Sequence, residues 1–76
     1  MENFIIDAVH SNDSYIVRAK SLQSAINKVI KMGRSLIANN KCTDIITYYI
    51  LDEIEEKPLR TIMLYKSGRK IVECIF

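Results

Sequence analysis

The sequence contains no tryptophan, one histidine, one proline, two glycines and two cysteines among its 76 residues. So little glycine and proline argues against a linker or a disordered tail. The two cysteines, Cys42 and Cys74, are too few for a disulfide framework, and one histidine cannot complete a four-ligand zinc site with them. We therefore expect one reduced, cytoplasmic domain over residues 1–76, with both thiols acting as small hydrophobic groups and with no metal or cofactor.

Long apolar segments and catalytic groupings are also missing. The longest apolar run, residues 48–51, is far too short to cross a bilayer, and the N-terminus lacks the basic start and apolar stretch of a secretory signal. His10 lies beside Ser11 and Asp13, but catalytic triads are assembled from separated chain positions whose side chains converge. The sequence thus predicts a surface histidine, no membrane association and no enzymatic activity.

The charges are segregated along the chain, although the net charge is only +2. Between residues 14 and 43 every charged residue is basic, and residues 57–70 are again basic without an acid. Between these blocks lies an acidic connection, which lacks the ligand spacing of a calcium loop: Asp52, Glu53, Glu55 and Glu56. Blocks of one sign create local fields that steer partners, or they form solvated surfaces, and the sequence leaves both interpretations open.

Hydrophobic patterning predicts five strands and one helix. The strands are expected over residues 4–9, 15–19, 43–51, 59–66 and 70–76, with a tight turn at Ser67-Gly68. Ser21 is a suitable N-cap, and apolar residues then recur at helical spacing from Leu22 to about Ala38, with Gly33 on the apolar side. The order ββαβββ predicts an α+β fold, namely a single antiparallel-rich sheet of about five strands with one helix packed on one face.

Several of these strands carry apolar residues on both faces, whereas a sheet covered on one side should alternate apolar and polar residues. One helix of 17 residues, about 25 Å long and 10 Å wide, covers about half of one face of a sheet that is about 20 Å wide. We expect the uncovered face to be an interface, either for a protein partner or for a second copy in a homodimer. The alternative is a strongly curled sheet that wraps the helix and buries both faces.

Basic residues form two candidate partner-binding groups. The helix carries Lys28, Lys31 and Arg34 at i, i+3 and i+6, opposite its apolar side. Around the predicted hairpin turn lie Tyr65, Lys66, Arg69 and Lys70. Such groups can neutralise phosphates, with a tyrosine available for base stacking, so a nucleic-acid-binding or regulatory module is the alternative function. The isoelectric point of 8.6 is lower than that of dedicated nucleic-acid binders, and a solvated basic surface is the simpler interpretation.

Two stretches carry a family resemblance. Residues 16–25, IVRAKSLQSA, run from a strand through a Ser-Leu cap into the helix, and residues 64–74, LYKSGRKIVEC, form a hairpin with a basic turn. Together with the ββαβββ order, they resemble small anti-CRISPR inhibitors of phages and mobile elements, in particular one class of type I-F inhibitor. The resemblance implies a non-enzymatic protein that binds a CRISPR effector complex in the host cytoplasm and blocks its binding to target DNA. The long helical region and the acidic connection depart from that pattern.

Overall fold

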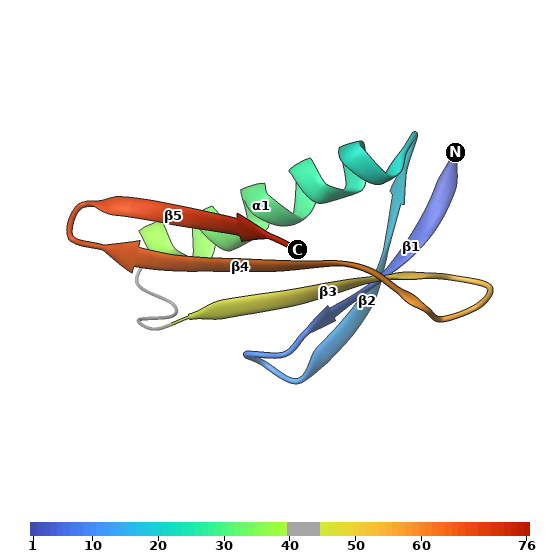
Figure 1. Cartoon of the computed structure of the whole chain (residues 1–76), viewed down its shortest axis with the longest axis horizontal. Coiled ribbons are helices and arrows are strands. Elements are labelled where there is room, and N and C mark those ends of the chain that lie inside the picture. The colour runs from blue at the N-terminus through green and yellow to red at the C-terminus, as the bar shows by residue number, and fades with distance from the viewer. Residues whose placement is uncertain (40–44) are drawn as a thin grey trace.

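The computed structural model describes residues 1–39 and 45–76 of the chain. Its elements follow the predicted order: β1 (Glu2–Ala8), β2 (Asp13–Ala19), α1 (Leu22–Ala38), β3 (Ile46–Asp52), β4 (Pro58–Ser67) and β5 (Lys70–Ile75) (Figure 1). All neighbouring strands are antiparallel, and the sheet order is β2-β1-β3-β4-β5. The predicted α+β fold, with one helix and a five-stranded antiparallel sheet, is confirmed.

Local signals in the sequence place the helix ends and the hairpin turn. Ser21 has extended backbone geometry, and its hydroxyl accepts a hydrogen bond from the Ser24 amide at 3.2 Å, as an N-cap does. The helix continues through Gly33 and ends at the C-cap Asn39. Gly68 has a φ of 61°, a conformation that glycine adopts without steric cost, and it forms the β4–β5 turn together with Arg69.

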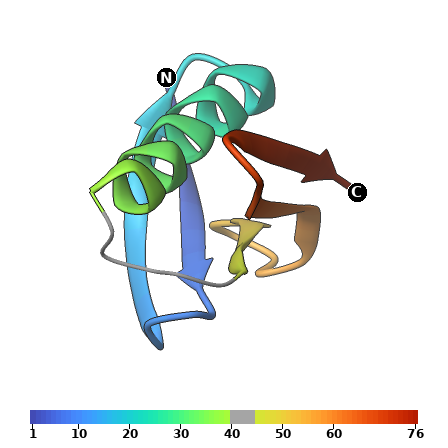
Figure 2. The same cartoon turned by 90° about the vertical axis from the view of Figure 1, so that its left-hand side faces the viewer.

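The sheet curls around the helix. Viewed from one end, the strands pass from β2 and β1 on one side of α1 to β5 on the other (Figure 2). One face of the sheet therefore lies toward the helix, and the molecule is elongated, with extents of 38 × 22 × 20 Å. The curled-sheet alternative is correct about the shape of the sheet, but the helix covers only the concave face.

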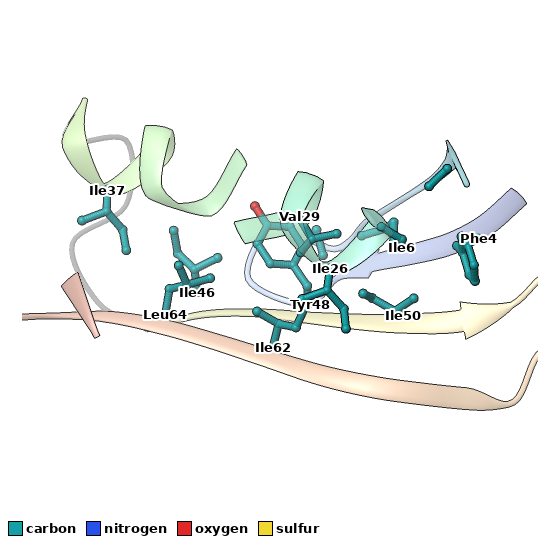
Figure 3. Close-up of a cluster of buried hydrophobic side chains, with 13 residues drawn as sticks. Phe4, Ile6, Ile26, Val29, Ile37, Ile46, Tyr48, Ile50, Ile62 and Leu64 are labelled. Atoms are coloured by element: carbon teal, nitrogen blue, oxygen red, sulfur yellow. The ribbon is translucent and has the colours of Figure 1, made fainter. Parts of the chain in front are cut away.

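The core fills the space between α1 and the concave face (Figure 3). It draws on the apolar side of the helix and on alternate residues of the strands. The buried side chains are those of Phe4, Ile6, Ala8, Ala19, Ala25, Ile26, Val29, Ile37, Ile46, Tyr48, Ile50, Ile62 and Leu64. The three central strands, β1, β3 and β4, supply eight of these thirteen residues and bury them almost completely. The core thus fixes which residues of each strand face away from the helix.

Gly33 lies where the helix packs against β3 and β4. A Cβ atom at this position would lie 2.8 Å from Cδ1 of Leu64 and 3.2 Å from Cε2 of Tyr48. Ordinary contacts of this kind are 3.4 Å or longer. A buried glycine at the helix–sheet contact, which the sequence predicted, is therefore confirmed.

Several predicted boundaries were wrong by one or two residues. Val9 lies outside β1, although its amide still donates to the Thr47 carbonyl at 3.0 Å, and β2 begins at Asp13 rather than at residue 15. β4 is longer than predicted because Pro58 and Ser67 belong to it. Ile45 and Phe76 lie outside β3 and β5, respectively. The predicted start of the third strand at Thr43 falls outside the described residues, as do Lys41 and Cys42.

Candidate partner-binding surfaces

The convex face of the sheet, which we call the open face, is largely apolar. Residues that alternate with the core residues point to this side, since successive side chains of a strand lie on opposite faces. The apolar members are Ile5, Ile16, Tyr49, Leu51, Met63, Tyr65, Val72 and Cys74, all of them half-buried or exposed. Ile16 is 62% exposed and Tyr49 39%. None of the described residues covers this side of the sheet (Figure 1).

The strand register gathers these side chains into rows across the sheet. Ile5 of β1 pairs with Ile16 of β2 on one side and with Leu51 of β3 on the other, which places three large aliphatic side chains next to one another. Met63 of β4 pairs with Cys74 of β5 in a second row. Cross-strand neighbours of this kind lie about 4.5–5.5 Å apart. The open face therefore carries two apolar rows, separated by a row in which Ser14, Asp7 and Thr61 lie beside Tyr49.

The exposed area of the chain agrees with an incompletely covered sheet. A compact monomer of 8.8 kDa is expected to expose about 4,800 Å². This chain exposes 5195 Å². Seven-residue strands about 23 Å long in a sheet about 20 Å wide give the open face a footprint of roughly 450 Å². The apolar side chains occupy part of this footprint, and exposed apolar patches of a few hundred Å² are typical of interaction sites.

The three basic residues predicted on the helix do not act as one group. Lys28 donates from Nζ to the Arg18 carbonyl at 2.6 Å, on the β2 side of the helix. Arg34 forms an ion pair with Glu73 of β5, on the opposite side of the helix. Within the described parts of the chain, Lys31 makes neither an ion pair nor a hydrogen bond, and it is exposed. In the predicted stripe, Lys31 is thus the cation without a partner among the described residues, Lys28 is held by a backbone carbonyl, and Arg34 is paired with a carboxylate.

The hairpin group is also divided between two faces. Lys66, Arg69 and Lys70 are all exposed around the β4–β5 turn. Tyr65, which pairs with Val72, lies on the open face and is half-buried there. Lys66 follows on the opposite face, the one that Leu64 also occupies. Tyr65 therefore belongs to the apolar open face, while the basic side chains surround the tip of the hairpin.

A groove between the helix and β2 was not predicted from the sequence. Two adjoining hollows of about 480 and 330 Å³ share Tyr15, Leu36 and Tyr48 in their linings. The His10 ring contacts the Tyr48 ring edge-on at a centroid distance of 4.9 Å, and its Nδ1 donates to the Thr47 carbonyl at 3.2 Å. His10 is therefore half-buried against an aromatic ring, which corrects the prediction of a surface histidine. These residues come from β2, α1 and β3, and only strand pairing and helix packing bring them together, so the groove has no local signal in the sequence.

The phenol of Tyr15 titrates abnormally in this groove. Burial raises the pKa of Tyr15 above its usual value, the side-chain hydrogen bond with Tyr48 opposes that shift, and the nearby negative charge of Asp13 adds to it. Tyr15 therefore remains protonated and neutral through the physiological pH range. The protonated phenol can take part in hydrogen bonds, but it is not an ionised nucleophile.

The acidic connection forms a closed turn between β3 and β4. The Asp52 carbonyl accepts from the Glu56 amide at 2.8 Å, and the Asp52 amide donates to the Lys57 carbonyl at 3.0 Å. The acidic side chains of the turn point into solvent, apart from the half-buried Asp52. Across residues 1–39 and 45–76, no three His, Cys, Asp or Glu side chains come together as a metal site would require. Cys74 is a free, half-buried cysteine on the open face, beside Met63.

Comparison of the chain with protein-family models, with curated proteins and with solved structures finds no match. Of the helical residues that the structure describes, none belong to a segment with the length and apolar character needed to span a bilayer.

Proposed function

We propose that the protein is a non-enzymatic interaction module that binds another protein through its open face. The supporting observation is the set of half-buried and exposed apolar side chains that β1–β5 present on the side away from the helix. Its aliphatic centre and its two half-exposed tyrosines match the composition of interface cores, which are enriched in aromatic residues and poor in charge. Most charged groups lie on the helix, at the hairpin tip and in the acidic turn, where they suit a polar rim and electrostatic steering, while Asp7 and Arg18 lie on the open face itself.

The partner implied by the family resemblance is a CRISPR effector complex in the host cytoplasm. In this proposal the open face docks on the effector and prevents target DNA from binding, and no bond is made or broken. The chain is small enough to act by occupying a surface rather than by reshaping it. The identity of this partner is inferred from the family resemblance, and the mode of binding is inferred from the apolar side chains of the open face.

The test uses a purified type I-F effector complex and measures its binding to target DNA as the protein is added. We expect inhibition that falls at least tenfold when Tyr49 of the central strand β3 or Ile16 of the edge strand β2 is replaced by lysine, because a charge that the partner covers loses its hydration. The comparison variant is Lys31→Glu, which reverses a charge on the helix away from the open face and should weaken inhibition much less than either lysine substitution, because a rim charge mainly changes the association rate.

Two outcomes would contradict the proposal in different ways. If the wild-type protein neither binds the effector complex nor affects its DNA binding, that partner is wrong. If the protein inhibits but only Lys31→Glu abolishes the effect, the partner is right and the binding surface is wrong. Circular dichroism of each variant is the control for retention of the fold.

Nucleic-acid binding is the second candidate function, and the exposed Lys66, Arg69 and Lys70 at one hairpin tip favour it. Three phosphate contacts would give a logarithmic salt dependence with a slope of about −2 to −3. DNA affinity measured between about 50 and 200 mM salt tests this directly. The absence of binding at the lowest salt concentration would remove this candidate.

A further inference from the structure

We infer that the outer edge of β5 pairs with β5 of a second copy of the chain, which joins two sheets into one of ten strands. β5 is the last strand of the sheet order, so no described strand pairs with its outer edge. The inference rests on the backbone of this edge and not on the open face. It can therefore hold or fail independently of the proposed function.

The β4–β5 ladder determines which backbone groups face outward. Thr61 and Phe76 exchange two hydrogen bonds, with N–O distances of 3.1 and 2.8 Å, and they therefore form a hydrogen-bonded pair. In an antiparallel ladder such pairs alternate with pairs that make no mutual hydrogen bonds. The amides and carbonyls of Cys74, Val72 and Lys70 consequently point toward β4 as well. Those of the intervening residues point outward: Ile71, Glu73 and Ile75.

The other edge of the sheet is protected. The Lys28 side chain reaches across β2 and donates to the Arg18 carbonyl, which occupies one of the acceptors that an added strand would need. Arg18 and Lys20 add exposed positive charge at the same end of that strand. Charged residues on an edge strand are a common device against strand addition, and β5 also carries them, at Lys70 and Glu73, so the two edges differ in the carbonyl contact of Lys28. β5 has no comparable contact among the described residues, since the Glu73 side chain is turned toward Arg34 of the helix.

The outward-facing groups of β5 are arranged symmetrically about Glu73. An antiparallel second copy centred on this residue pairs Ile71 with Ile75, and every outward amide then meets an outward carbonyl. On the opposite face the same register places Val72 against Cys74. These pairs join apolar side chains on both faces of the strand.

Other registers fit less well. A shift by one residue aligns outward-facing groups with residues whose hydrogen bonds are already made to β4. A shift by two residues places Ile71 against Glu73 of the second copy, which pairs an aliphatic side chain with a charge. In the centred register, the two Glu73 side chains face each other, and each has Arg34 of its own chain as a counter-ion. β5 therefore favours antiparallel pairing with β5 of a second copy, in the register centred on Glu73.

A two-fold axis perpendicular to the sheet would relate the two copies, and most small homo-oligomers have this cyclic symmetry. Both helices would then lie on one side of the ten-stranded sheet, and both open faces on the other. The dimer would be weak, because one strand pair buries little area, and it should form between about 10 µM and 1 mM protein.

Sedimentation equilibrium over that range tests the inference. We expect the mass to rise from 8.8 kDa toward twice that value. Glu73→Pro removes an outward amide but no bond to β4, and it should weaken the dimer at least tenfold. Glu73→Gln keeps the amide and should retain the dimer. Ile16→Pro makes the equivalent change on the β2 edge and should have no effect.

Disulfide trapping tests the register without relying on the proline variant. In a background with Cys42→Ser and Cys74→Ser, we expect a mixture of Ile71→Cys and Ile75→Cys chains to form a heterodisulfide, and neither chain alone to dimerise. Paired residues of this type have Cα atoms about 5.5 Å apart, within the range that a disulfide spans. A monomer at 1 mM, a dimer that survives Glu73→Pro, or equal cross-linking through Ile16→Cys would overturn the inference.

Discussion

Replacing Gly33 by alanine tests how closely the helix packs on the sheet. At an exposed helical site this change stabilises a protein by roughly 1 kcal/mol. Here the new methyl group would lie 2.8 Å from Leu64 Cδ1, which must move by about 0.6 Å to reach the 3.4 Å of ordinary contact. Leu64 is fully buried, and overpacking of this kind costs about 1–3 kcal/mol. We therefore expect a net loss of about 1 kcal/mol, or a melting temperature lower by about 4–8 °C.

Urea unfolding of a double-mutant cycle with Leu64→Val measures this contact. Valine lacks the δ-carbon that the alanine methyl would meet, so the double variant should be more stable than the sum of the single changes predicts, by at least about 0.5 kcal/mol. If Gly33→Ala proved more stable than the wild type, the helix would have to stand farther from the sheet than the structure places it. Additivity in the cycle would equally refute the reasoning.

Three further outcomes are expected. Ser21→Ala should cost about 1 kcal/mol in urea unfolding because it removes the N-cap, and an unchanged midpoint would contradict that role. Since the pKa of Tyr15 is raised in the folded state, its contribution to stability should be complete below about pH 10 and lost as the pH rises beyond it. Unfolding measured from pH 8 to 11 should show this loss, and Tyr15→Phe should reduce it. The Arg34–Glu73 pair is partly exposed, so a double-mutant cycle should give a coupling below about 1 kcal/mol that weakens with salt.

The elements of this fold were predictable because their signals are local. Helical spacing from Leu22 to Ala38, a serine before it and a glycine in the hairpin each report on a few neighbouring residues. The alternation within strands likewise identified the two faces correctly, for example Tyr15 and Val17 on one side and Ile16 on the other. Boundary errors arose where tertiary pairing, rather than side-chain pattern, extends or ends a strand, as at Asp13 and Pro58.

The order of the strands in the sheet has no such local signal. It depends on which strands are placed between two neighbours and which lie at an edge of the sheet. β1 combines Phe4, Ile6 and Ala8 in the core with Ile5 on the open face, and it lies inside the sheet between β2 and β3. β2 has a similar open face, since its Arg18, Ile16 and Ser14 pair with Asn3, Ile5 and Asp7, but its core-side Tyr15 and Val17 are only half-buried, and it lies at an edge. The groove at Tyr15 depends on the same order, since Tyr48 reaches it only through the pairing of β3 with β1.

The basic residues show where reasoning from spacing alone fails. Lys28, Lys31 and Arg34 lie at intervals of three, and each step of three turns the side chain by about 60° around the helix axis. Over six residues the accumulated rotation of about 120° directs Lys28 toward β2 and Arg34 toward β5. Whether such residues form one binding surface depends on the groups that lie beside each of them. Here Lys28 donates to the Arg18 carbonyl, and Arg34 pairs with the Glu73 carboxylate. The apolar side chains of the open face therefore support partner binding more strongly than the basic residues of the helix do.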